Sequence, residues 1–461
     1  MKTRATAVIL GSCLLANGLG AAEPPPPATE KSAFIQFMEQ DYLLGTWGGG
    51  RTWLKDHGVD FEFVYFGAWP HNVQGGIKTG NVLEGAFMML LDLDSEKLAG
   101  YPGGHLRAGG LSIHNGDPFS PNYVGDLNQV SLLDFPDTLR LWELWYEQMF
   151  FSGKLSLKFG QMAIDQDFIM PEYYLTLASL NFLNQTFFYP TVAFNVYDQN
   201  IPGFPVGHHA LASTPYGAPG ARLRYSPTER CYVQAGVYDG NPDRFGDGTR
   251  INLHKEEGAL AYFEAGYRLN GAKGDSGLPG NYKVGGWYHT DEFFDYKSTL
   301  TAPFTGAAPE VHSGNWGVYF LADQTLYRED EPDDDPARQG LAGFFRVALA
   351  PPDRNLAPFG IDGGLVYKGL FPTRDWDTLG VAFSYMELSD DIADAQRFMN
   401  SIIPGIAGEP VDYEAVLEVS YRAQLTAWWT LQPDFQYVMH PGGSSQNDDA
   451  FVWSLFTTLR F

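Results

Sequence analysis

The end of the chain carries the pattern that most restricts its fold, a row of alternating apolar residues that continues to the last position. One face of this segment carries Phe451, Trp453, Leu455, Thr457, Leu459 and Phe461, and the other carries Val452, Ser454, Phe456, Thr458 and Arg460. A period of two is the period of a β-strand. An apolar row that ends on an aromatic residue is typical of the last strand of a bacterial outer-membrane barrel, although the edge strand of a soluble β-sandwich would have the same alternation.

The start of the chain predicts export. Residues 1–22 have a basic start, an apolar stretch too short to span a bilayer, and small residues just before Glu23. An alternative is a lipoprotein signal that ends at Cys13. If residues 1–22 are removed, Cys231 is the only cysteine left, so the exported protein would have no internal disulfide.

The composition excludes some partners and leaves a membrane protein possible. Loss of Lys2 and Arg4 with the signal leaves 28 basic residues against 55 acidic ones, a net charge of −27, which argues against nucleic acid as a partner. The rest of the chain has no apolar run of about 18 residues, so no transmembrane helix is predicted. A mean hydropathy of −0.21 still suits a barrel, because only alternate residues of its strands face lipid.

The periodicity divides the chain into three parts: a signal peptide at 1–22, a periplasmic segment at 23–58 and a barrel at 59–461. The second part begins with a Pro-rich linker and continues with helical spacing at 33–42 and 51–57. After residue 58 the period becomes two. We therefore predict an all-β fold, a transmembrane antiparallel β-barrel of about 16 strands with a short N-terminal helical segment. The sixteen predicted strands are 59–68, 82–93, 104–113, 140–150, 153–160, 219–226, 231–239, 257–269, 281–291, 314–327, 341–350, 359–369, 377–388, 412–425, 427–438 and 451–461.

The connections between these strands differ in length in the way that outer-membrane barrels require. Short links lie at 151–153, 226–230 and near Thr426, and long ones lie at 114–139, 161–218 and 389–411. Short periplasmic turns and long external loops are typical of such barrels. A connection as long as 161–218 is usually functional, and we expect it to fold inward and narrow the lumen.

The strand at 141–150 suggests a polar contact surface. Its lipid-like face is predicted to carry Trp142, Leu144, Tyr146 and Phe150, and its other face carries Glu143, Trp145 and Glu147. Carboxylates accept hydrogen bonds from hydroxyl groups, and an aromatic ring can cover the apolar face of a pyranose. This face is therefore either a surface for sugars or a hydrated wall with an incidental Trp.

Two basic residues are predicted to join this surface. Arg107 is predicted to face the lumen, because its neighbour Leu106 falls on the apolar face of the same strand. The strands 104–113 and 140–150 follow each other in the chain, so we expect them to be neighbours in the barrel. Lys158 has the same parity in the next strand. The predicted constriction, in which carboxylates hold a guanidinium beside an indole, consists of Arg107, Glu143, Trp145, Glu147 and Lys158. The alternative is that these charges only brace the wall.

Several segments together resemble one family. They are 43–51, with Thr46 where Asp is usual, then 124–127, 130–131, 141–148 and 158–161 with Asp165 and 167–168, and finally 418–421, Trp428, 432–433, 436–437 and 441–443. In these segments the sequence is similar to the carbohydrate-selective OprB-type porins of Gram-negative outer membranes. The resemblance covers most of the mature chain.

The resemblance implies a barrel of sixteen strands through which monosaccharides such as glucose diffuse passively and selectively into the periplasm. Partners would be mono- or small oligosaccharides and outer-membrane lipid, with no nucleic acid, and the protein would be a homotrimer or a monomer. No cofactor is implied. Alternatives are a porin for other small neutral or cationic solutes, a secreted β-rich glycosidase or lectin, and a barrel enzyme such as a lipase or protease.

Motifs for catalysis or metal binding do not add another function. The sequence has no dinucleotide fingerprint, no phosphate loop and no His-Glu-x-x-His pattern. His208 and His209 are adjacent and lack an evident third ligand. The acidic run 329–335 could attract Ca²⁺, but its spacing is not that of a 12-residue calcium loop. We therefore predict no enzyme, no catalytic residue and no metal site.

Overall fold

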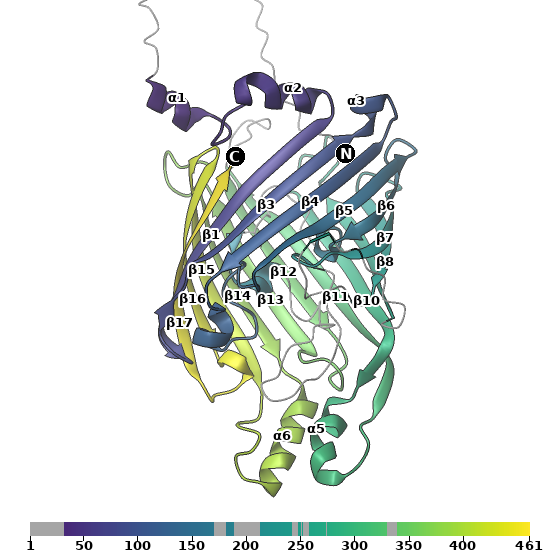
Figure 1. Ribbon diagram of the computed structural model, residues 1–461, viewed down its shortest axis with the longest axis vertical. Helices are drawn as coiled ribbons and strands as arrows, with labels where there is room; N and C mark the ends of the chain where they lie inside the picture. The colour runs from purple at the N-terminus through teal and green to yellow at the C-terminus, as the bar shows by residue number, and fades with distance from the viewer. Residues whose placement is uncertain are drawn as a thin grey trace, which may run out of the picture.

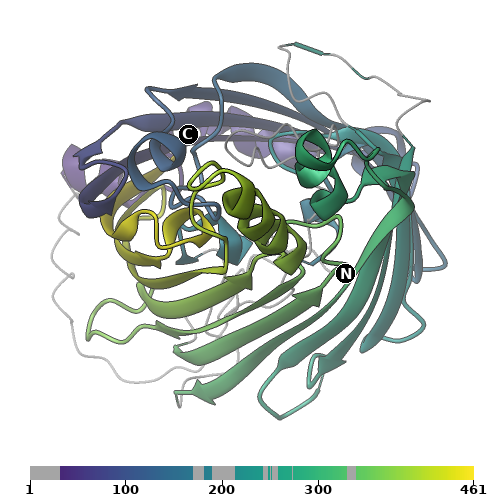
Figure 2. The ribbon, with the colours of Figure 1, turned by 90° about the horizontal axis from the view of Figure 1, so that it is seen from below.

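The described strands form one closed antiparallel sheet, a barrel (Figures 1 and 2). The computed structural model describes residues 32–169, 181–188, 213–241, 248–249, 251, 258–272, 274–329 and 339–461. Each long strand pairs with its neighbours in chain order, and β1 pairs with β17 to close the ring. The two-residue β2 only joins the tip of β1, so sixteen strands make up the wall and the predicted number is confirmed.

The strands agree closely with the predicted ranges. They are β1 (Val59–Gly76), β2 (Gly80–Asn81), β3 (Glu84–Asp94), β4 (Gly104–Asn115), β5 (Thr138–Phe150), β6 (Leu155–Met162), β7 (Ala218–Tyr225), β8 (Cys231–Asp239), β9 (Ala259–Leu269), β10 (Gly280–Phe294), β11 (Val311–Arg328), β12 (Gly340–Leu349), β13 (Phe359–Lys368), β14 (Thr378–Glu387), β15 (Tyr413–Thr426), β16 (Trp429–Met439) and β17 (Asp448–Arg460).

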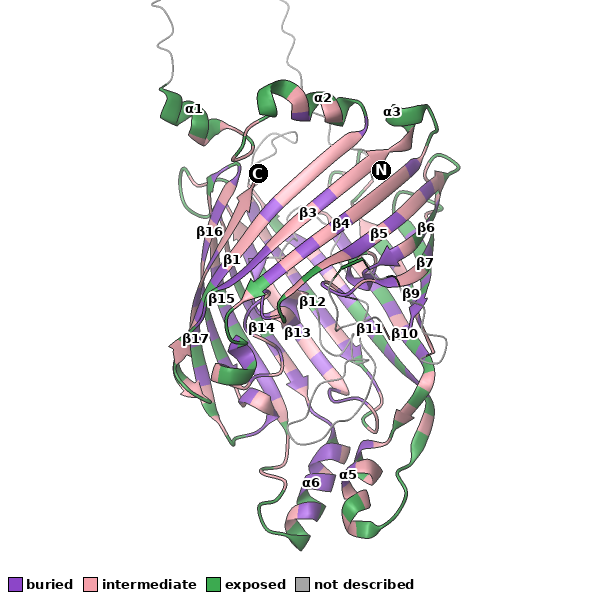
Figure 3. Cartoon of the chain, in the orientation of Figure 1, coloured by how far each residue is buried: buried purple, intermediate pink, exposed green. Residues whose placement is uncertain are grey.

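Buried residues alternate with more exposed ones along the strands of the wall (Figure 3). In β8, Val233 and Val237 are exposed on the outside, whereas Gln234 and Tyr238 are buried on the inside. The last strand follows the predicted parity, with Phe451 exposed and Val452 buried. An apolar outer face and a more polar inner face are what a barrel needs in lipid, because a closed sheet also satisfies its backbone hydrogen bonds.

Helices lie at both ends of the barrel (Figure 1). At the end that carries the short turns are α1 (Ala33–Glu39), η1 (Trp47–Gly49), α2 (Gly50–Asp56) and α3 (Ser95–Ala99), of which α1 and α2 correspond to the predicted helices. At the other end, α5 (Tyr296–Thr305) and α6 (Asp390–Ile402) pack together below the barrel and were not predicted. None of the described helices is long and apolar enough to cross a membrane.

Two connections contribute residues to the inside of the barrel. The connection between β4 and β5 contains the π-helical turn η2 (Ser120–Val124), and the one between β6 and β7 contains η3 (Ile164–Gln166) and α4 (Gln185–Phe188); η6 (Pro441–Gly443) lies between β16 and β17. The backbone amides of Leu183 and Asn184 donate to the Glu418 carboxylate at 2.5 and 3.0 Å. Glu418 lies on β15, across the ring from β6, so this part of the connection contacts the opposite wall of the barrel.

Five predicted features fall wholly or mostly outside the described residues. They are the signal peptide at 1–22, the Pro-rich linker that follows it, most of the inward connection 161–218, the adjacent His208 and His209, and the acidic run 329–335, of which only Glu329 is described. Glu329 accepts a hydrogen bond of 2.7 Å from the Tyr367 hydroxyl.

Candidate functional site

The five predicted constriction residues lie on three successive strands, β4, β5 and β6. Arg107 is directly opposite Trp145 in the pairing of β4 with β5, and Glu147 is opposite Lys158 in the pairing of β5 with β6. The predicted neighbourhood of these strands is therefore confirmed. The side chains form two groups that differ in exposure and in their partners.

Arg107 belongs to the accessible group. Its guanidinium donates to both oxygens of Asp92, Nε to Oδ1 at 2.7 Å and Nη2 to Oδ2 at 3.0 Å. His105 Nε2 lies 2.9 Å from the same Asp92 Oδ1. The Arg107 side chain is 27% exposed, so a solute inside the barrel can reach it.

The carboxylate that holds Arg107 is not one of those predicted. We expected Glu143 and Glu147 to fix the guanidinium, but Asp92 does so from β3, on the other side of β4. Asp92 is directly opposite Arg107 in the pairing of β3 with β4. Cross-strand neighbours have their Cβ atoms about 4.5–5.5 Å apart, so this register decides the partner. An acidic residue of lumen parity in the preceding strand was the signal available in the sequence.

Lys158 belongs to a buried ionic network with Arg222, Glu147 and Asp167. Lys158 Nζ lies 2.9 Å from Asp167 Oδ2, and Arg222 Nη2 lies 3.0 Å from Glu147 Oε1 and 3.1 Å from Asp167 Oδ1. Ser156 donates to Glu147 and accepts from Arg222. Asp167 follows η3, so this network fastens the connection after β6 to the wall. Arg222 and Asp167 were not predicted as site residues.

Trp145 lies between the two groups and is mostly covered. Its side chain is only 6% exposed, and Lys158 Nζ lies 4.1 Å from the centroid of its ring. The Arg107 guanidinium lies 5.4 Å from the ring, and the His105 ring meets it edge-on. Cations near an indole face are stabilised by its quadrupole. The indole thus supports the two basic side chains and offers little open surface for stacking.

Glu143 is fully buried and has no hydrogen-bond partner among the described residues. It comes from the same face of β5 as Trp145. A buried carboxylate in this position is costly unless cations or a proton compensate it. It therefore shapes the field around Arg107 and Lys158 from within the wall, and it is not accessible to a solute.

The predicted position of Trp142 is wrong. We placed it on the lipid face, but its side chain is 3% exposed and packs inside with Leu183. The cause is a β-bulge: Gly109 pairs with Glu143 and Gly110 with Leu141, so Trp142 is the extra residue in β5. An extra residue moves the side chains on one side of the bulge to the opposite face of the strand from the one that strict alternation predicts. A period-two reading of the sequence cannot reveal this change.

Other buried carboxylates hold the inward connections in place. Glu414 accepts from the backbone amides of Leu127, Asn128 and Gly442 at 2.8–2.9 Å. Glu264 accepts from the amide of Ile169 at 2.9 Å and from two tyrosine hydroxyls. Part of the acidic composition is therefore structural, because a carboxylate can accept several backbone hydrogen bonds. Sequence analysis did not identify these anchors.

A closed sixteen-strand barrel with an apolar outer face and loops that contact its inner wall defines an outer-membrane porin of a Gram-negative bacterium. The family model described as "Carbohydrate-selective porin, OprB family" matches residues 83–461, and the chain belongs to this family. The expected family and location are therefore confirmed. In outer-membrane barrels the end with the short turns generally faces the periplasm, and the end with the long loops faces outward.

Individual relatives agree with the family. Porin B of Pseudomonas aeruginosa is 28% identical, with 98% of this chain and 97% of that protein covered. The high-pH structure of Pseudomonas putida OprB superimposes with a TM-score of 0.80 at 26% identity, over 92% of this chain and 99% of that one. The low-pH structure of the same porin covers the same shares with a TM-score of 0.55 at 18% identity and supports the fold alone. The family description and the name of the Pseudomonas aeruginosa relative both identify porins.

Proposed function

We propose that this porin allows passive diffusion of monosaccharides such as glucose into the periplasm, with Arg107 as the main sugar contact of the constriction. The observation that carries the proposal is the fork of Arg107 held by Asp92 on the inner wall, beside His105 and Trp145. A guanidinium offers planar donors, and a carboxylate and an imidazole offer acceptors, which matches the alternating hydroxyl groups of a pyranose.

The other predicted residues affect the sugar indirectly, because they support either Arg107 or the barrel wall beside it. Trp145 supports the guanidinium, and the network of Lys158, Glu147, Arg222 and Asp167 keeps the connection after β6 against the strands. Glu143 adds negative charge behind them. A pore must release what it admits, so we expect weak, millimolar-scale sugar affinity rather than tight binding.

A second candidate function is a porin for other small neutral or cationic solutes. The net charge of −25 favours it over a function in anion uptake. It shares the barrel and the constriction with the first candidate and differs in the solute that Arg107 contacts. A secreted glycosidase or lectin has no support from the family.

Liposome swelling distinguishes these functions. Purified porin is reconstituted and tested with glucose, other sugars, neutral amino acids and organic anions of similar size. Faster swelling with monosaccharides than with amino acids of equal mass supports the proposal. Equal rates for all neutral solutes would refute sugar selectivity and leave a general pore, and preference for anions would refute both candidates.

The division of the chain is part of the same proposal. We expect a signal peptidase to remove residues 1–22, so that the mature protein begins at Glu23 and has its residues 23–58 in the periplasm. Sequencing of the N-terminus of purified protein tests this. A start other than Glu23 would refute it, and the mass of the solubilised complex would separate a homotrimer from a monomer.

A further inference from the structure

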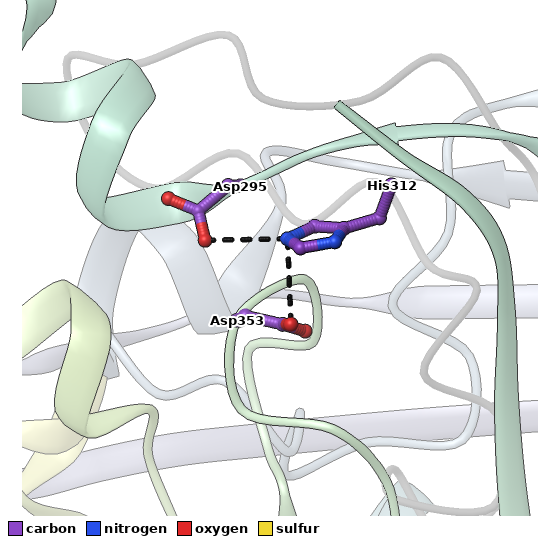
Figure 4. Close-up of side chains that lie close together, drawn as sticks. All are labelled: Asp295, His312 and Asp353. Carbon is purple, nitrogen blue, oxygen red and sulfur yellow. Dashed lines mark hydrogen bonds and ion pairs between the residues drawn. The ribbon is translucent and has the colours of Figure 1, made fainter. Parts of the chain in front are cut away.

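Three side chains of metal-ligand type meet at the outer end of the barrel (Figure 4). Asp295 precedes α5 as its N-cap, His312 lies near the start of β11, and Asp353 lies in the connection between β12 and β13. One ligand atom of each lies within 4.8 Å of the others. All three side chains are partly exposed, so an ion can reach them.

The spacing of these atoms is longer than that of an ordinary ion pair. His312 Nε2 lies 3.4 Å from Asp295 Oδ2 and 3.3 Å from Asp353 Oδ2. Charge-assisted hydrogen bonds are about 2.7–2.9 Å long, and His105 and Asp92 in the same barrel are 2.9 Å apart. Ligands that surround a zinc ion tetrahedrally at about 2.0–2.1 Å are separated from each other by about 3.3–3.4 Å.

We propose that Asp295, His312 and Asp353 form a zinc site, in which water completes the tetrahedron. An imidazole nitrogen with two carboxylate oxygens suits Zn²⁺, whereas Ca²⁺ and Mg²⁺ take oxygen ligands in larger number. The proposal does not depend on which solute the porin carries.

Hydrogen bonds already orient both carboxylates. The amide of Ser298 donates to Asp295 Oδ1 at 2.7 Å, which leaves Oδ2 directed at His312. Arg354 donates to Asp353, from Nε to Oδ1 at 2.8 Å and from Nη2 to Oδ2 at 3.1 Å. Outer partners of this kind fix metal ligands in their binding geometry. Each carboxylate oxygen retains a lone pair beyond those used by these donors.

The charge around the three residues favours a cation. Asp391 of α6 faces the same region, and burial followed by repulsion from Asp295 raises its pKa, with a further contribution from Asp353. Arg354 and Lys297 are the basic residues nearby, and Lys297 pairs with Asp394 at 2.8 Å. A divalent ion between Asp295 and Asp353 would reduce this repulsion.

An ion here would fasten the outer loops to one another. The amide of Tyr296 donates to the Asp353 carbonyl at 2.8 Å, and the amide of Ser389, the N-cap of α6, donates to the Leu356 carbonyl at 2.9 Å. α5, α6 and the β12–β13 connection are thus already joined. In Figure 2, α6 projects across the mouth of the barrel, so zinc would stabilise the entrance.

Calorimetric titration with Zn²⁺ tests the site. We use folded porin in detergent after chelator treatment, with His208 and His209 both changed to Ala so that this adjacent pair cannot bind the ion. In that background we expect one Zn²⁺ per chain, at least tenfold weaker binding in His312→Gln and in Asp353→Asn, and no change in His57→Gln. His57 is a matched control, because it stacks on Trp53 at the periplasmic end. Wild-type affinity in His312→Gln, or no binding by the parent chain, would overturn the proposal.

A second measurement uses the chain without changes at the site. Zn²⁺, but not Ca²⁺ at the same concentration, should protect His312 from diethyl pyrocarbonate, as read by mass spectrometry of the peptides, while His57 stays reactive. Modification of His312 at the same rate with and without Zn²⁺ would overturn the proposal even if the variants fail to fold. Heat-dependent migration on gels verifies that each variant is a folded barrel.

Discussion

The guanidinium of Arg51 donates a hydrogen bond to the main-chain oxygen of Phe461, which lies 410 residues further along the chain. Its other terminal nitrogen donates to the Phe61 carbonyl at 2.6 Å, and its carbon lies 3.4 Å from the centroid of the Tyr42 ring. Leu43 also donates to the Arg460 carbonyl at 2.8 Å. The segment that precedes β1 therefore holds the seam where β1 meets β17.

Arg51→Ala should lower the stability of the barrel. The change leaves the partly buried main-chain oxygens of Phe61 and Phe461 without a charged donor, and a hydrogen bond from a charged group is worth about 1.5–3 kcal/mol. The fraction of folded protein after heating, read from migration on gels, measures the loss. Lys55→Ala in the same helix is the control, because Lys55 pairs with Asp60 in an exposed ion pair that contributes little. Equal losses in the two variants would contradict a specific role for Arg51.

Deletion of Phe461 should reduce the amount of folded barrel in the outer membrane without preventing export. The amide of Phe461 donates to the Phe63 carbonyl at 2.9 Å, and its ring meets the Phe87 ring at 5.8 Å. The deletion removes both contacts at the seam. Fractionation followed by gels of unheated samples gives the folded fraction, and Phe461→Tyr should restore it. Normal assembly of the truncated protein would contradict this prediction.

The wall of the barrel was predictable because its signal is local. Each strand has lipid on one face and water or loops on the other, and this difference imposes a period of two on its sequence. The pattern located all sixteen long strands. The pattern weakens where a strand leaves the lipid. For this reason the first strand was expected at 59–68 but continues to Gly76. The helix α6 was missed, although Ser389, Asp390 and Asp391 form a recognisable N-terminal cap.

The site was only partly predictable because its partners depend on register and on long-range contacts. Parity placed Arg107 and Trp145 on one face, but only the pairing of β3 with β4 shows that Asp92 holds the guanidinium. Likewise, Asp167 reaches Lys158 because the connection after β6 turns back onto the wall. No period in the sequence encodes a β-bulge such as the one at Trp142.

Glu418→Gln should loosen the part of the β6–β7 connection that contacts β15. A carboxylate accepts from both Leu183 and Asn184, whereas the amide group of glutamine turns a donor toward one of them. We expect faster hydrogen exchange at 181–184 and larger, noisier single-channel currents. Glu409→Gln is the control, because Glu409 is bound only by the exposed Ser445 among the described residues. Unchanged exchange and current in Glu418→Gln would show that other contacts suffice.

The pore should prefer cations to anions at low salt. The net charge is −25, and most basic residues near the constriction are already paired with carboxylates, as Lys158 and Arg222 are with Asp167. The preference should weaken as salt increases, because the screening length falls to about 10 Å at 0.1 M. The reversal potential across a salt gradient in a planar bilayer measures it. Selectivity for anions at low salt would contradict the prediction.

Arg107→Ala should weaken sugar block of the single-channel current. The change removes the guanidinium N–H donors that Asp92 leaves free, and loss of one hydrogen-bonding group costs about 1–3 kcal/mol, which corresponds to roughly a 5- to 150-fold rise in the blocking constant. Arg107→Lys should recover only part of the affinity, since an ammonium group does not reproduce the planar fork.

Two further variants separate sugar contact from a general effect of charge. Glu143→Ala should change conductance more than sugar affinity, because Glu143 is buried behind the surface. Arg460→Ala is the matched arginine control, since Arg460 pairs with Glu62 at 3.1 Å in an exposed ion pair near the end of β17. The contrary outcome is that the sugar affinity of Arg107→Ala and Glu143→Ala equals that of the unchanged protein while only conductance differs. In that case Arg107 and Glu143 contribute charge to the barrel wall and do not contact the sugar. The selective contacts would then belong to the 161–218 connection.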